Sequence, residues 1–176
     1  RVLKNLGFSS ILLAEDGFEA IKLMRSRHVD LILTDWELRP QSQTDIIPPN
    51  GVIASEWGEF PPHNGASFVQ CLRHSRFSPN LFVPVIMLTS PTQANHIHYA
   101  RDAGVNEIIV KPIIADALCK RITEIVEHPR PFITSGKYKG PCRRRRQTPL
   151  NGKPDRRKSE IRVITYEEAR KAVRNA

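Results

Sequence analysis

Three short apolar runs in the chain each lead to a polar side chain that could do chemistry. The first run leads to Asp35, the second to Thr89 and the third to Lys111. Such runs are typical of buried parallel strands. In an open α/β sheet, ligands bind beyond the carboxyl ends of the strands. We therefore expect a carboxylate, a hydroxyl and an ammonium group to meet in one crevice.

These three residue types suit phosphoryl transfer to a carboxylate. Asp35 can act as an oxygen nucleophile and become an acyl phosphate. The phosphoryl group brings negative charge, which the hydroxyl of Thr89 and the ammonium group of Lys111 could stabilise. Because the Asp35 carboxylate and the incoming phosphoryl group are both negatively charged and repel each other, a hard divalent cation such as Mg²⁺ is also expected, held by oxygen ligands.

Alternating strand and helix patterns surround these residues and predict a parallel sheet with helices on both faces. The expected strands lie near residues 10–14, 30–34, 83–88 and 107–110. The expected helices lie near residues 17–26, 65–74, 93–102 and 115–127. The fold class is therefore α/β.

The order of Asp35, Thr89 and Lys111 after successive strands resembles the receiver domain of two-component response regulators. A turn at residues 14–17, a helix end at 101–105 and the pair Lys111-Pro112 support the resemblance, which covers about residues 1–128. It implies a doubly wound parallel sheet of the flavodoxin/CheY type, with strand order 2-1-3-4-5. It also implies a cis peptide bond before Pro112.

The resemblance assigns phosphorylation to Asp35 and a magnesium site to the Asp35 side chain and the backbone carbonyl of Glu37. In the family, an acidic pair at the end of the first strand completes that site. The chain begins too late to contain this strand or its acidic pair, and Glu15-Asp16 fits a solvated turn after the second strand. We interpret the chain as a fragment, the alternative being that another chain fills the gap. Mg²⁺ is expected for the intact protein and not for these residues alone.

Two further departures concern the loops and the output of the domain. An insertion at about residues 41–63 separates Asp35 from the Asn64-Gly65 pair that should open the next helix. The insertion could cover the crevice, bind a partner, or be a flexible loop. Ile108 stands where many receivers have an aromatic residue whose rotation reports phosphorylation, so output could instead use the insertion or the C-terminal segment.

Residues 129–176 differ in composition from the rest and form a basic extension. They contain 15 Lys and Arg against 4 Asp and Glu, a net charge of +11, which leaves −2 for residues 1–128. Two basic clusters consist of Arg143, Arg144, Arg145, Arg146, Arg156, Arg157 and Lys158. We expect an extended, flexible segment, with a short helix over residues 166–176. Its clusters could bind nucleic-acid phosphates, an acidic protein or anionic lipid.

The resemblance implies a phosphoacceptor that receives its phosphate from a histidine kinase or a phosphotransfer protein. It would catalyse only its own phosphorylation and dephosphorylation and would not be a conventional enzyme. The alternatives are a degenerate receiver that acts as an interaction module, and nucleic-acid binding through the basic extension. The helix near residues 115–127 and the one before it, near residues 93–102, could form a homodimer interface. No membrane span or secretion signal is evident, so we expect a soluble cytoplasmic protein.

Overall fold

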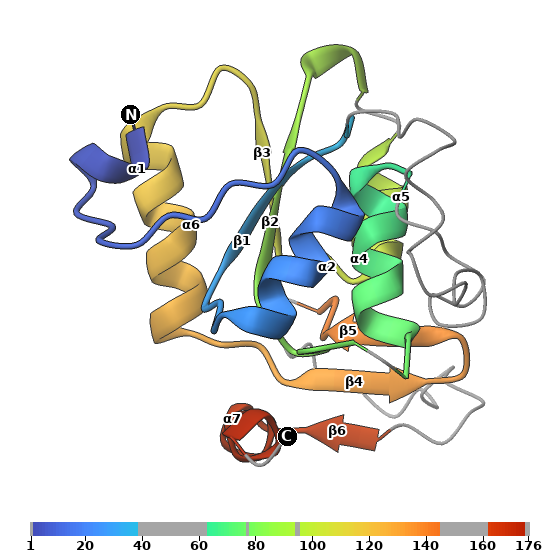
Figure 1. Ribbon diagram of the computed structural model, residues 1–176. Helices are drawn as coiled ribbons and strands as arrows, with labels where there is room; N and C mark the ends of the chain where they lie inside the picture. Colours follow the sequence, from blue (N-terminus) through green and yellow to red (C-terminus); the bar gives the residue numbers. More distant parts are fainter. Residues whose placement is uncertain (1, 39–62, 77, 94–95, 145–161, 175–176) are drawn as a thin grey trace, which may run out of the picture.

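The computed structural model describes residues 2–38, 63–76, 78–93, 96–144 and 162–174. Its centre is a parallel sheet of three strands, β1 (Ile32–Asp35), β2 (Val85–Thr89) and β3 (Glu107–Val110), in the order β1-β2-β3 (Figure 1). The expected parallel α/β sheet is confirmed for these strands. None of the described helices is both long enough and apolar enough to span a membrane.

The register of the sheet places the three candidate residues at one edge. Asp35 lies opposite Leu88, and Thr89 lies opposite Val110, the residue before Lys111. Parallel strands all point the same way, so their carboxyl ends must lie together. Asp35 and Thr89 are therefore the last residues of β1 and β2, and Lys111 directly follows the adjacent strand β3.

Helices cover both faces of this sheet. On one face, α2 (Gly17–Ser26), α4 (Gly65–His74) and α5 (His96–Ala103) pack against Val85 and Met87. On the other face, α1 (Val2–Asn5) and α6 (Ala115–Glu127) pack near Ile86. Successive side chains of a strand point to opposite faces, which explains why neighbouring residues of β2 belong to different clusters.

Side-chain caps fix the starts of two helices where the sequence predicts them. Asp16 accepts hydrogen bonds from the backbone of Phe18 and Glu19 at the start of α2. Asn64 and Ser67 form a reciprocal capping box at the start of α4. Helices α2, α4 and α6 have the predicted bounds, whereas α5 begins three residues later than predicted, after a 3₁₀ turn at Pro91–Gln93.

The predicted strand near residues 10–14 does not form. Residues 11–14 have no strand pairing, and the side chain of Leu13 is 83% exposed. In the predicted strand order this segment pairs only with the first strand, and no described residue takes that position. A strand without a neighbour leaves its backbone groups unpaired, which explains why this apolar run has no regular structure here.

The described part of the basic extension contains regular structure. Antiparallel strands β4 (Phe132–Ser135), β5 (Tyr138–Pro141) and β6 (Arg162–Ile164) form a second sheet in the order β5-β4-β6. Helix α7 (Tyr166–Arg174) follows and confirms the helix predicted there. Composition indicated an extended segment, but Phe132 and Ile133 are buried, and Gly136 supplies the positive φ of 52° in the hairpin turn.

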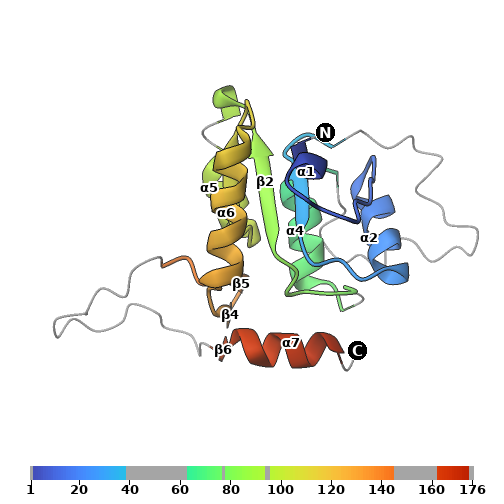
Figure 2. The ribbon, with the colours of Figure 1, turned by 90° about the vertical axis from the view of Figure 1, so that its left-hand side faces the viewer.

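This second sheet lies at the edge of the parallel sheet that is opposite Asp35. Figure 2 shows β4, β5, β6 and α7 below the parallel strands. Arg130 Nη2 donates a hydrogen bond to the carbonyl of Asn106, just before β3, and Arg130 Nη1 donates to the carbonyl of Cys142 at 2.9 Å. The extension is therefore attached where the parallel strands begin.

Candidate functional site

Asp35 and Lys111 form the centre of the candidate site. Lys111 Nζ donates a hydrogen bond to Asp35 Oδ2 and forms an ion pair with it. The side chain of Asp35 is 37% exposed and that of Lys111 is 42% exposed, so the pair is open to solvent and to a reacting molecule. The backbone N–H of Lys111 donates to the Thr89 carbonyl at 2.8 Å, and the peptide bond to Pro112 is cis, as expected. The ammonium group is thus positioned by the end of β3.

Thr89 ends the strand between the two charged residues. It is 3% exposed, and its hydroxyl donates to the carbonyl of Ser90 at 3.4 Å. The hydroxyls of Ser90 and Thr92 lie 2.9 Å apart in the segment that follows. The structure therefore brings Asp35 and Lys111 into direct contact and places Thr89 at the same edge of the sheet.

The backbone around Asp35 is fixed by the start of α4. The Gly65 N–H donates to the Trp36 carbonyl at 2.8 Å, and the Trp36 N–H donates to the Leu88 carbonyl at 2.9 Å. A Cβ atom on Gly65 would lie only 2.1 Å from the Asp35 carbonyl oxygen. The sequence predicted a helix start at Asn64-Gly65, but the contact that requires glycine there was not predicted.

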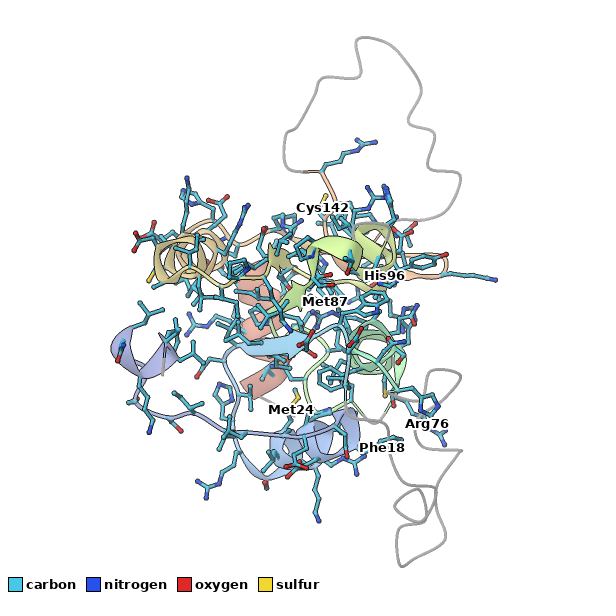
Figure 3. All side chains as sticks on the ribbon, turned by 90° about the horizontal axis from the view of Figure 1, so that it is seen from above. Phe18, Met24, Arg76, Met87, His96 and Cys142 are labelled. Atoms are coloured by element: carbon cyan, nitrogen blue, oxygen red, sulfur yellow. The ribbon has the colours of Figure 1, made fainter. Side chains whose placement is uncertain are left out.

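An aromatic pair beside the acceptor was also missed by the sequence analysis. The Trp36 and His96 rings stack with their centroids 4.1 Å apart and an interplanar angle of 15°. His96 Nδ1 is buried and has no hydrogen-bond partner. Figure 3, which looks down on the molecule, labels His96. The sequence does show an aromatic residue, Trp36, directly after Asp35. In the structure its ring links the end of β1 to His96, the first residue of α5.

The described residues do not make a complete magnesium site. Asp35 has one carboxylate, and the side chain of Glu37, two residues later, is exposed. Among residues 2–38, 63–76, 78–93, 96–144 and 162–174, no group of three or more His, Cys, Asp or Glu side chains could hold a metal ion. A hard cation needs six or more oxygen ligands, several of them water in the case of Mg²⁺. Residues beyond this set would have to complete the site.

The basic clusters and the insertion lie largely outside the described residues. Arg145, Arg146, Arg156, Arg157, Lys158 and residues 39–62 are not described. Arg143 forms a 2.9 Å ion pair with Asp102, near the end of α5, and its guanidinium carbon lies 3.9 Å from the centroid of the Tyr138 ring. The first residue of the basic cluster is therefore held against α5, and it does not lie at the Asp35 edge of the sheet.

Comparisons with known proteins agree with this geometry. The chain is 29% identical over 126 residues to the chemotaxis protein CheY of Pseudomonas aeruginosa. The aligned residues cover 72% of this chain and 82% of the relative. No protein-family model matches the chain.

Solved structures share the fold. A structure described as a response regulator of Chloroflexus aurantiacus superposes with a TM-score of 0.53 at 20% identity and covers 72% of this chain and 84% of that one. The receiver domain of a sensor histidine kinase from Pseudomonas aeruginosa PAO1, with a magnesium ion in its active-site cleft, gives 0.50 at 21% identity and covers 72% and 83%. Likeness in sequence and likeness in fold point to the same class of protein.

Proposed function

We infer that this chain, a CheY-like receiver domain by its likeness in sequence and fold, accepts a phosphoryl group on Asp35 in a two-component relay. The observation that carries this proposal is the ion pair between Lys111 Nζ and the Asp35 carboxylate. This pair lies at the carboxyl edge of a parallel sheet, where ligands bind in such folds. It remains open to solvent, as a nucleophile that meets an incoming donor must be.

The residues at this edge can support the transfer in a single displacement. A carboxylate oxygen of Asp35 attacks the phosphorus atom of a phosphohistidine, and an O–P bond forms as the N–P bond breaks. The imidazole nitrogen of the donor keeps the electron pair of the broken bond. Lys111 would stabilise the charge on the transferred group, and Thr89 would offer its hydroxyl if it turned from Ser90.

A magnesium ion belongs to the proposal only in part. The ion would supply further positive charge at the phosphoryl group, and the Asp35 carboxylate and the Glu37 backbone carbonyl would contribute to its binding. Since the described residues provide no further carboxylate cluster, we propose that an acidic pair on a first strand is needed to complete the site. A solved neighbour of the same fold has a magnesium ion in its active-site cleft, which supports a magnesium site at this position.

The partner that delivers the phosphate would be a histidine kinase or a phosphotransfer protein in the cytoplasm. The protein would promote its own phosphorylation and dephosphorylation and would not turn over an external substrate. Signalling would follow from changed protein contacts. One such contact would be a homodimer interface formed by α5 and α6. These assignments rest on likeness to other receivers and on the exposed position of Asp35.

A second candidate function is a degenerate receiver that binds partners without being phosphorylated. In such a receiver the ion pair between Lys111 and Asp35 would be a structural contact only. Binding of an anionic partner, such as nucleic acid, by the basic extension could coexist with either function. It would weaken with salt and would not depend on Asp35.

Phosphorylation with a small phosphoryl donor such as acetyl phosphate, in the presence of Mg²⁺, tests the proposal. We expect weak labelling of this chain and strong labelling of a form extended by a strand that ends in two acidic residues. Asp35→Asn should abolish the label in both. Asp30→Asn should keep it, because Asp30 is exposed and pairs with His28 at 3.2 Å before the start of β1, at the opposite end of this strand from Asp35. An extended, folded form that takes up no label would show the degenerate receiver to be correct.

A further inference from the structure

Helix α5 contacts the acceptor edge of the sheet at one end and the C-terminal extension at the other. Its first residue, His96, stacks on Trp36, the residue after Asp35. Its last turn carries Asp102, which forms a 2.9 Å ion pair with Arg143 of the extension. A helix of eight residues is about 12 Å long. One short, rigid element therefore joins the extension to the acceptor strand.

Strand β5 approaches the end of α5 with no side chain between them. Gly104 follows the helix with a φ of 96°, and a Cβ atom on Gly140 of β5 would lie 2.8 Å from the Gly104 Cα atom. A Cβ atom on Gly104 would in turn lie 2.8 Å from the Lys139 carbonyl oxygen. Arg73 Nε and Nη2 each donate a hydrogen bond to the Gly104 carbonyl at 3.2 Å. The close approach and the buried donor hold the end of α5 against the hairpin of β4 and β5.

Only small side chains anchor α5 along its length. Its buried residues are Ala100 and Ala103, whereas Ile97 and Tyr99 are exposed. Two alanines bury little apolar surface, so burial contributes little to holding the helix in place. The contacts at the two ends of α5 therefore matter most for its position.

At the acceptor end, the stack on His96 reaches the backbone that carries Asp35. The Trp36 ring packs against the core, and its backbone N–H and carbonyl are hydrogen-bonded to β2 and to the start of α4. His96 Nδ1 is buried and has no hydrogen-bond partner among the described residues, so the ring contact and not a bond at this atom positions the imidazole. A displacement of α5 would pass through the two rings to Trp36 and to Asp35 beside it.

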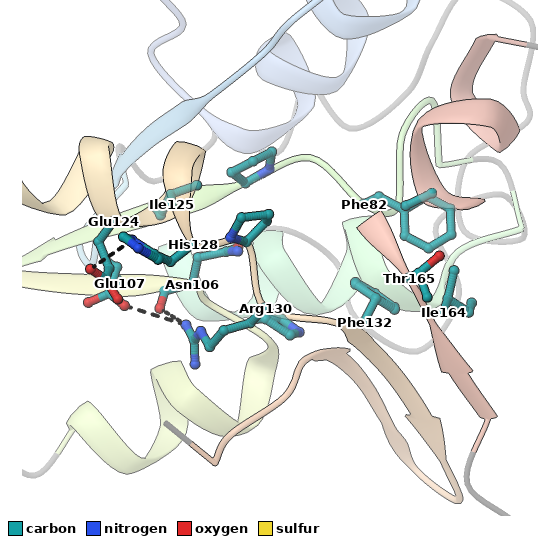
Figure 4. A pocket seen from close by; sticks show the side chains of 14 residues that line it. Phe82, Asn106, Glu107, Glu124, Ile125, His128, Arg130, Phe132, Ile164 and Thr165 are labelled. Atoms are coloured by element: carbon teal, nitrogen blue, oxygen red, sulfur yellow. Dashed lines mark hydrogen bonds and ion pairs between the residues drawn. The ribbon is translucent and has the colours of Figure 1, made fainter. Parts of the chain in front are cut away.

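The extension also contacts the beginning of β3. Arg130 pairs with Glu107 at 3.5 Å in the wall of a cavity of about 320 Å³ between the extension and the parallel sheet (Figure 4). Because the cavity separates part of the two surfaces, fewer van der Waals contacts hold them together there. Docking of the hairpin on α5 is therefore an important part of what holds the extension.

We propose that the extension positions the acceptor edge through α5, with His96 as the positioning residue that contacts Trp36. Docking of the hairpin at Gly104 holds α5 where its first residue stacks beside Asp35. The coupling is reciprocal, so a change at Asp35 that moves Trp36 alters the docking of the extension by the same free energy. This last step rests on the proposed phosphorylation of Asp35, whereas the chain of contacts does not.

Fluorescence of Trp36 measures the coupling in the whole 176-residue chain, in which Trp57→Phe leaves Trp36 as the single tryptophan. In this background Gly140→Ala, which forces the hairpin away from Gly104, should increase quenching of Trp36 by acrylamide because the ring stack loosens. Lys137→Ala, an exposed change in the same hairpin, should leave quenching unchanged. Unchanged quenching in a folded Gly140→Ala variant would overturn the proposal.

Arg143 supplies the same test if Gly140→Ala does not fold. Arg143→Gln removes the ion pair with Asp102 and should also increase quenching of Trp36. Arg143→Lys keeps the charge and should restore the original quenching. Quenching that is the same in all three forms would contradict the coupling.

His96→Ala separates positioning from a general loss of stability. Without the ring, Gly140→Ala should no longer change the quenching of Trp36, because the two changes then act on one broken contact and are not additive. His96→Phe keeps a stacking ring and should keep the response. Equal responses with and without a ring at position 96 would show that His96 is not the positioning residue.

Labelling by acetyl phosphate and Mg²⁺ connects the coupling to the proposed function. Gly140→Ala should slow labelling of Asp35 by about tenfold, less than the effect of a 1 Å displacement at a reacting group. An unchanged rate would show that docking of the extension does not act on the acceptor. Absence of label from the unmodified chain and from its extended form would overturn the proposed phosphorylation, whereas the Trp36 result would still decide the coupling.

Discussion

At the scale of single residues, burial decides which nucleophiles of this chain can react. Cys71 is 1% exposed, and burial raises the pKa of its thiol to about 11. Cys119 is exposed and Cys142 half-buried, and all three cysteines are free thiols. The three cysteines have no paired spacing in the sequence, which is typical of free thiols. Spacing does not rank their reactivity, since accessibility depends on the packing of α4 and α6.

We predict that the three thiols react with Ellman's reagent in the order of their exposure. At about pH 8 Cys119 should react first and Cys142 more slowly, while Cys71 should stay protected, because only about one in a thousand Cys71 thiols is ionised. Because the pKa of Cys71 is higher in the folded protein than in the unfolded chain, the protonated thiol favours the folded state. This contribution to stability is lost as the pH rises from about 9 towards 11. Reaction of Cys71 should accelerate over that interval.

The control for this experiment is Cys71→Ala. The variant should show the same two reactive thiols as the unmodified chain at about pH 8, and a third thiol should appear only in the unmodified chain after denaturation. Loss of one of the two reactive thiols in Cys71→Ala would show that Cys71 is accessible in the folded protein.

At the scale of elements, the start of α4 supports the acceptor strand. Asn64 and Ser67 cap the helix, and Gly65 lies against the Asp35 carbonyl. A glycine at an ordinary helix position costs about 1 kcal/mol relative to alanine, so replacement usually stabilises. Here the added Cβ would lie 2.1 Å from the Asp35 oxygen, and the backbone would have to move. The close approach therefore outweighs helix propensity.

We predict that Gly65→Ala lowers the unfolding free energy by about 2 kcal/mol, measured by urea denaturation, because overpacking outweighs the gain in propensity. It should also slow labelling of Asp35 by about 100-fold, the effect of a displacement near 1 Å at a reacting group. Gln70→Ala on the same helix should change neither quantity greatly. A Gly65→Ala variant with normal stability and labelling would show that α4 does not position Asp35.

At the scale of the whole molecule, Arg73 joins the parallel sheet to the extension. The residue is 1% exposed, and burial lowers the pKa of its guanidinium to about 10, so it remains charged at neutral pH. It donates hydrogen bonds to the carbonyls of Leu81 at 2.6 Å, Val83 at 2.8 Å and Gly104 at 3.2 Å. Its guanidinium carbon lies 5.6 Å from the centroid of the Phe132 ring in β4. Arg73 thus fixes two loops and touches the second sheet.

We predict that Arg73→Met destabilises the protein by about 3 kcal/mol or more, because several buried carbonyls lose their donor. Urea denaturation provides the measurement, and protease digestion should show earlier cleavage between residues 129 and 142. Arg76→Met, just beyond α4 and exposed, should cost less than about 0.5 kcal/mol. Equal effects of the two substitutions would show that the buried network is not what holds the extension.

Local sequence patterns are sufficient to predict the parallel strands, the bounds of α2, α4 and α6, and the presence of Asp35, Thr89 and Lys111 at one edge of the sheet. These features follow from local periodicity, caps and the common direction of parallel strands, all of which are read from neighbouring residues. The prediction of a strand near residues 10–14 was wrong, because an apolar run forms a strand only where a neighbouring strand pairs with its backbone.

How the extension packs against the parallel sheet follows from tertiary contacts and could not be predicted from sequence. Arg73 bonds to a residue 31 positions away, Arg130 to one 24 positions away, and the cavity between the extension and the parallel sheet takes walls from five separate stretches of chain. The composition of residues 129–176 indicated a solvated basic segment, since charge is visible in sequence whereas the burial of a few apolar residues is not. Contacts between distant segments depend on the packing of the complete fold, and local patterns do not specify them.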